Sequence, residues 1–128
     1  MERTLLLTFS NPSSADIEEE YHSWYTQVHI PQLLEHVPAI KVARRYRVVG
    51  EEMPHRFLVI YEIEGEVDEV LAGLAARRVD GSIQRSSNLQ VDPPPLVVFA
   101  EPIDDCGRPL KAEERRVSEA ERDGELAT

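Results

Sequence analysis

The chain of 128 residues has one cysteine, few aromatic residues and no long hydrophobic run. The single cysteine, Cys106, cannot form an internal disulfide, and the neighbouring Asp104 and Asp105 disfavour the thiolate that a catalytic cysteine needs. No segment has the roughly 20 apolar residues that cross a bilayer, and the first residues lack the cationic and apolar regions of a signal peptide. We therefore expect a cytoplasmic protein with no membrane partner.

Positive charge and phosphate-binding glycines are also scarce. The formal net charge is −10, which argues against a nucleic acid partner because binding to phosphates draws on lysines and arginines. The sequence has no glycine-rich phosphate or dinucleotide loop, so a nucleotide cofactor is not expected. These absences leave small molecules and other proteins as partners.

Short apolar runs and turn residues predict a βαββαβ order of elements. The expected strands cover residues 4–10, 40–49, 55–63 and 96–100, and the expected helices cover 14–36 and 67–79. Pro31 lies inside the first helix and predicts a kink or a new helical turn, because proline removes the bond to the carbonyl of Gln27. This order predicts an α+β, ferredoxin-like fold, in which a four-stranded antiparallel sheet carries both helices on one face.

The sequence indicates one domain at 1–101 and a charged C-terminal extension at 102–128, in which residues 112–122 would be either an exposed helix or disordered. Strands 40–49 and 55–63 have apolar or amphipathic residues on both faces. The sheet face opposite the helices would therefore leave a large apolar patch in water. We expect a second copy of the chain to cover it, so that two sheets close into a barrel in a homodimer.

The first helix concentrates the residues that carry chemistry. Three of the four histidines, the only tryptophan and two of the four tyrosines lie between residues 21 and 36. At 100° per residue, one arc packs into the core and a neighbouring arc is polar. The core arc consists of Ile17, Tyr21, Trp24 and Val28, and the polar arc includes His22, Tyr25 and His29.

His29 is the leading candidate for a general acid or base, because imidazole titrates near neutral pH. Tyr25, one turn earlier, is a candidate hydrogen-bond donor to a carbonyl or a developing enolate. His22, two turns before His29, would complete a relay or anchor the substrate, and Trp24 would supply an apolar wall. The structural alternative is that His29 only bonds a backbone carbonyl freed by Pro31.

Further candidates for substrate binding lie on the strands. Arg44 and Arg45 point to opposite faces, so at most one reaches an interior anion; we favour Arg44, which shares its face with Tyr46. Tyr61 is a similar candidate on the next strand. A metal site is not expected, because His22 and His29 are seven residues apart whereas helical zinc ligands sit four apart.

The segment from Trp24 to Pro31 reads W-Y-x-x-x-H-x-P, and it is followed by an A-R-R-Y strand at 43–46. Over about residues 3–101 this pattern resembles the dimeric α/β-barrel superfamily, and its EthD-like branch in particular. The resemblance implies a homodimer with a pocket between the sheet and the helices of each subunit. Members include muconolactone isomerases, polyketide cyclases, cofactor-free monooxygenases, haem-degrading enzymes and dehydratases.

The resemblance and the candidate residues together favour a cofactor-independent enzyme of the lyase, isomerase or cyclase type. Its substrate would be an aromatic or polyketide-like small molecule, and its chemistry would be proton transfer by His29 and Tyr25. Two alternatives remain open at this point. One is a cofactor-free monooxygenase of phenolic substrates, and the other is a dimer that binds a small molecule or haem without catalysis.

Overall fold

The computed structural model describes residues 3–83, 86–104 and 106–107. Four strands form one sheet in the order β2-β3-β1-β4, and each neighbouring pair is antiparallel. The strands are β1 (Thr4–Ser10), β2 (Ile40–Arg47), β3 (Phe57–Ile63) and β4 (Leu96–Ala100). Strands β2 and β3 are each two residues shorter than predicted, because residues 48–56 are taken up by the connection between them.

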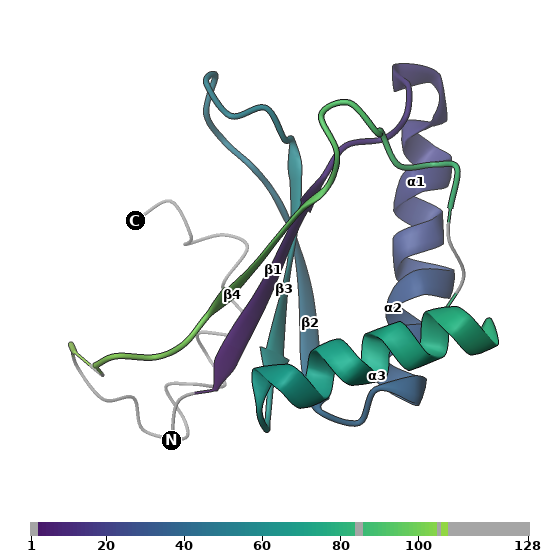
Figure 1. Cartoon of the computed structure of the whole chain (residues 1–128). Helices are drawn as coiled ribbons and strands as arrows, with labels where there is room; N and C mark the ends of the chain where they lie inside the picture. Colours follow the sequence, from purple (N-terminus) through teal and green to yellow (C-terminus); the bar gives the residue numbers. More distant parts are fainter. Residues whose placement is uncertain (1–2, 84–85, 105, 108–128) are drawn as a thin grey trace, which may run out of the picture.

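Helices cover one face of this sheet, as Figure 1 shows. The first helical stretch comprises a 3-10 turn (Ala15–Ile17), α1 (Glu18–Trp24), a π-helical turn η2 (Tyr25–His29) and α2 (Ile30–His36). The second is α3 (Val67–Asp80), which ends at Gly81 in the left-handed conformation that favours glycine. The βαββαβ order, the strand order and the placement of the helices confirm the α+β, ferredoxin-like fold. Within the described ranges, no helix is long and apolar enough to span a membrane.

The core lies between the sheet and the helices. Alternation along β1 and β3 turns every second residue toward the helices, and these residues are buried wherever a helix covers them. The buried apolar residues are Leu6, Tyr21, Tyr25, Leu33, Val37, Ile40, Phe57, Val59, Tyr61, Ile63, Val70 and Ile83. Two tyrosines of the first helical stretch and one of β3 therefore occupy the centre of the fold.

The other face of the sheet is apolar and has no described element over it. Its large apolar residues come from three adjacent strands: Leu5, Leu7, Phe9, Leu58, Ile60, Leu96 and Val98. The two residues of β4 in this group are 46% and 39% exposed. This surface, called the open sheet face below, has the composition that the sequence predicts for an interface.

A π-helical turn replaces regular α-helix just before Pro31. The amide of Ile30 donates to the carbonyl of Tyr25, five residues back, and Pro31 follows in the first turn of α2. The helix geometry thus changes next to Pro31, where the sequence predicts a kink or a new helical turn. A π turn holds about one residue more than an α turn, which delays the following residues by about 100° around the axis. The common arc predicted for His22 and His29 is therefore wrong.

Candidate functional site

His29 closes the π turn and lies in an aromatic environment. Its ring stacks on Trp24, with centroids 4.4 Å apart and planes inclined by 15°. Tyr25 meets it edge to face, with centroids 5.4 Å apart. The Nδ1 atom of His29 is buried and has no hydrogen-bond partner in the described part of the chain. The histidine is therefore held by ring packing, and not by the freed backbone carbonyl that the structural alternative required.

Burial and charge set the protonation state of His29. Desolvation lowers the pKa of its imidazole from 6.5 to about 4, and the positive charge of Arg78 on α3 contributes in the same direction. At neutral pH the ring is consequently uncharged. A neutral imidazole can accept a proton, which is the property that a general base requires.

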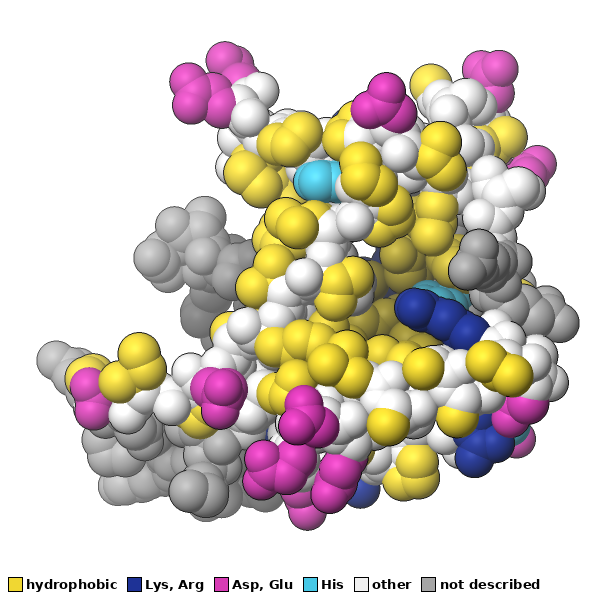
Figure 2. Space-filling model, in the orientation of Figure 1, with side chains coloured by type: hydrophobic (Ala, Val, Ile, Leu, Met, Phe, Trp, Pro, Cys, Tyr) yellow, Lys and Arg dark blue, Asp and Glu magenta, His cyan; other side chains and the backbone are white. Residues whose placement is uncertain are grey.

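A hollow opens between the helices and the sheet on the face shown in Figure 2. Hydrophobic side chains form most of its surface, and one histidine and a cationic side chain lie at its margin. Strand β4 contributes to this side, since Val97 pairs with Thr8 and therefore faces the helices, yet remains 53% exposed. The helices thus leave the β4 end of the sheet partly uncovered, which provides room for an apolar ligand.

Tyr25 lies in the core and not on the predicted polar arc. It is 3% exposed, and its hydroxyl lies 3.0 Å from the Ser10 Oγ atom. Tyr21 bonds the same serine oxygen at 2.6 Å, so one hydroxyl of β1 joins two helical phenols. Burial raises the pKa of Tyr21 to about 12 and raises that of Tyr25 as well. Both phenols stay protonated at neutral pH and tie the helix to the sheet.

Tyr61 of β3 adds a third phenol to this interior. Its hydroxyl and that of Thr8 on β1 are buried, and neither makes a hydrogen bond of normal length and angle within the described residues, although Thr8 lies near enough to lower the pKa of Tyr61. Burial raises the pKa of Tyr61, and the neighbouring Tyr25 contributes to the rise. The structure thus brings Tyr61 close to Tyr25, and it leaves polar atoms without partners beneath the first helical stretch.

His22 faces away from this interior, toward the edge strand β2. Arg45 donates from Nη2 to the Nδ1 atom of His22 at 2.8 Å, because a guanidinium can only donate. The hydrogen of His22 therefore resides on Nε2, which faces Glu18 at 3.5 Å. Both ring nitrogens thus lie next to charged side chains, and His22 helps to position Arg45.

Arg44 and Tyr46 lie on the open sheet face, whereas Arg45 points toward the helices. Arg44 pairs with Glu62 at 2.7 Å, and the guanidinium carbon of Arg45 lies 4.9 Å from the centre of the Tyr25 ring. A bulge between Ile40 and Val42 causes the difference, because one extra residue reverses which side chains face the core. Sequence periodicity could not detect this bulge.

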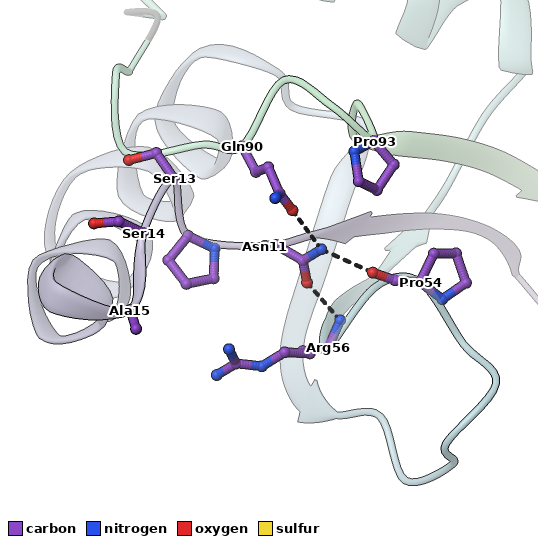
Figure 3. A pocket seen from close by; sticks show the side chains of 9 residues that line it. Asn11, Ser13, Ser14, Ala15, Pro54, Arg56, Gln90 and Pro93 are labelled. Atoms are coloured by element: carbon purple, nitrogen blue, oxygen red, sulfur yellow. Dashed lines mark hydrogen bonds between the residues drawn. The ribbon is translucent and has the colours of Figure 1, made fainter.

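A polar cleft that the sequence did not predict lies at the end of β1 (Figure 3). It encloses about 340 Å³, and Asn11 lies at its centre. The side-chain Nδ2 of Asn11 donates to the carbonyl oxygen of Pro54 and to Gln90 Oε1, and its side-chain Oδ1 accepts from the backbone N–H of Arg56. These bonds are 2.6–2.9 Å long. These bonds join β1, the turn before β3 and the loop before β4. With every polar atom of Asn11 engaged, this residue holds three segments together.

Metal ligands do not converge in the described residues, where no group of three histidine, cysteine or acidic side chains is placed to hold an ion. The arrangement instead offers one uncharged imidazole supported by aromatic rings, in a fold with an apolar hollow between its helices and its sheet. Of the predicted site residues, Trp24, Tyr25 and His29 come together and Tyr61 lies next to Tyr25. His22, Arg44 and Tyr46 lie elsewhere.

Comparison with known proteins gave one likeness. No family model and no curated protein matches the chain. A solved structure of an EthD (ethyl tert-butyl ether D) family protein from Bacillus halodurans is similar, with a TM-score of 0.49 and 12% sequence identity. The similarity covers 80% of this chain and 100% of that protein.

Proposed function

We propose that this protein is a cofactor-independent lyase, isomerase or cyclase that acts on an aromatic or polyketide-like small molecule, with His29 as general base. The observation that carries the proposal is the partly buried, uncharged imidazole stacked on Trp24. Figure 2 shows an apolar hollow between the helices and the sheet. Flat apolar substrates suit such a surface, and a buried base acts without competition from water.

The proposed reaction begins when His29 takes a proton from a carbon next to a carbonyl group of the substrate. The substrate becomes an enolate, and the imidazolium then returns the proton to another atom of the same molecule, which balances the step. Burial of His29 disfavours the imidazolium cation that this step forms. The negative charge of the enolate must therefore stabilise the cation. Tyr25 acts here as a positioning residue, because its hydroxyl is bonded to Ser10.

We also propose that the working molecule is a homodimer paired through the open sheet face. Apolar side chains of β1, β3 and β4 form this face, and no described element covers it. The apolar hollow lies on the opposite, helix-bearing side of the sheet (Figures 1 and 2), so pairing in this way leaves it accessible. Each copy would thus keep its own site.

Proton transfer can be tested without knowing the natural substrate. Wild-type protein in D2O should catalyse deuterium exchange at the activated carbon of at least one member of a panel of aryl ketones, followed by proton NMR. His29→Gln should reduce this rate by about 100-fold or more, because positioned acid–base groups contribute factors of that order. Tyr25→Phe should retain most of the rate, and His36→Gln, at the end of α2, should match the wild type.

Two results would overturn the proposal: no exchange with any ketone of the panel, or undiminished exchange in His29→Gln. Oxygen uptake with hydroquinones would replace it by a cofactor-free monooxygenase, in which the same pocket deprotonates a phenol. A saturable Soret shift on titration with haem, together with no turnover, would replace it by a binding protein.

A further inference from the structure

A second cluster of candidate binding residues lies on the other side of α1, at the edge strand β2. Five residues line an open cavity of about 170 Å³ there: His22, Arg45, Tyr46, Arg47 and Phe57. The Tyr25 ring lies between this cavity and His29. The Arg45 guanidinium lies over the face of this ring, and the His29 imidazole meets the ring edge to face. The cavity is therefore distinct from the proposed proton-transfer site.

Two positive charges at this cavity have no acidic partner in the part of the chain that the structure describes. Arg45 and Arg47 are two residues apart on one strand, so they project from the same face about 7 Å apart. Among the described residues, neither has a carboxylate within 4.0 Å. The nearby Arg56 is paired with Glu18 and does not add a free charge. Two cations without an acidic partner among the described residues are a specific local feature in a chain of net charge −10.

Ring contacts hold both guanidinium groups in place. The Arg47 guanidinium carbon lies 5.3 Å from the centre of the Phe57 ring, and His22 meets that ring edge-on at 4.7 Å. Arg45 is fixed by its bond to His22, and its Nε atom is buried without a partner in the described structure. Groups held in advance in this way lose little side-chain freedom when they bind an anion.

We propose that this cavity binds a small oxyanion, the phosphate or carboxylate group of a small molecule, between Arg45 and Arg47. Planar guanidinium groups match the oxygen geometry of both anions. At about 170 Å³ the cavity is smaller than sites that enclose a whole drug-sized ligand, so it holds an anionic group and not an entire aromatic molecule.

The test is a titration of the full chain with inorganic phosphate, with chloride adjusted to constant ionic strength, followed by the NMR signals of His22 and Arg47. A repeat with acetate distinguishes phosphate from carboxylate as the preferred group. Wild-type protein should show saturable shifts in the millimolar range, and Arg47→Gln should weaken binding about tenfold, equivalent to 1.4 kcal/mol. Arg44→Gln is the matched control, because its side chain pairs with Glu62 on the opposite face.

The proposal fails if the shifts stay linear with both anions, since that shows no site. It also fails if Arg44→Gln weakens binding as much as Arg47→Gln, since that shows only a response to overall charge. Arg47 is exposed, so its replacement leaves the fold intact, and a well-dispersed amide spectrum of the variant verifies this. Neither result depends on turnover, so failure here is independent of the proposal for His29.

Discussion

At the scale of single residues, the protonation of His29 links the site to stability. Its pKa is about 4 in the folded chain and 6.5 when the side chain is solvated. Between these values the unfolded chain binds one proton more than the folded chain. The stability contributed by neutral His29 is thus fully present above pH 6.5, and it is lost as the pH falls toward 4.

We predict that the free energy of unfolding falls more steeply with decreasing pH in the wild type than in His29→Gln. Between pH 6 and 4.5 the two slopes should differ by up to about 1.4 kcal/mol per pH unit. Glutamine has a similar size and does not titrate, so the difference between the two slopes isolates the imidazole. Urea unfolding at a series of pH values measures both slopes. Parallel curves for the two proteins would show that folding does not change the proton affinity of His29.

The buried phenols offer a matched pair of substitutions. Tyr21 and Tyr61 are 0% and 1% exposed, but only the Tyr21 hydroxyl has a hydrogen-bond partner among the described residues. Tyr21→Phe should cost about 1 kcal/mol or more, because it breaks a buried bond to Ser10. Tyr61→Phe should be neutral or stabilising, because it removes a buried hydroxyl without a partner.

Urea denaturation at neutral pH compares the two phenylalanine variants directly. Since the rings and their packing stay the same, the difference reports the hydroxyl groups alone. Equal losses of stability in both variants would mean that the Tyr61 hydroxyl has a partner as good as that of Tyr21.

At the scale of elements, the π turn determines which side chains of the first helical stretch face each other. It brings His29 against Trp24, five residues earlier, while His22 in α1 before the turn faces β2. π turns inside α-helices are frequent at functional sites. In this chain the turn has a clear structural consequence, because it separates the two histidines that a regular helix would align.

Removing one residue tests the π turn. Thr26 is exposed within η2, and its hydroxyl bonds only backbone carbonyls of the preceding turn, His22 O at 3.1 Å and Ser23 O at 3.5 Å. Deleting it should restore α geometry, rotate α2 by about 100° relative to α1, and cost several kcal/mol as Leu33 leaves the core.

The substitution Thr26→Ala, which keeps the residue count, is the control for that deletion. It should change stability by less than about 0.5 kcal/mol, as is usual for exposed positions. Circular dichroism checks that helix content persists, and urea unfolding gives the stabilities. A deletion variant as stable as the alanine variant would show that the π turn does not set the packing of α2.

At the scale of the whole molecule, the proposed dimer is accessible to direct measurement. Ile60 lies on the open sheet face, so Ile60→Asp should separate the copies while the helix-side core stays intact. We expect wild-type protein to sediment at twice the 14.6 kDa of the chain and the variant to sediment as a monomer. Val79→Glu is the control, because Val79 is 90% exposed on α3.

Sedimentation velocity at several protein concentrations separates these outcomes. A wild-type monomer at all concentrations would overturn the dimer. Dissociation of both variants to the same extent would instead indicate that added negative charge, and not the position of Ile60, weakens an already acidic assembly.

The sequence by itself determined the order of elements, the strand pattern and the ferredoxin-like topology, because these follow from local periodicity, turn residues and chain connectivity. It also located Trp24 and His29 on one helical stretch. Local rules could not show that Tyr25 belongs to the core or that Arg45, rather than Arg44, faces the helices. The β2 bulge set the orientation of the two arginines, and packing of the helix on Ser10 of β1 buried Tyr25.

Only the tertiary structure decided these orientations, because a π turn or a bulge forms where long-range packing outweighs local geometry. Burying Tyr21 and Tyr25 against Ser10 of β1 requires the helix to fit the sheet, and a pattern in one segment contains no information about that fit. The protonation state of His29 was decided in the same way, since it depends on burial beneath Trp24 and on the charge of Arg78 from a distant helix.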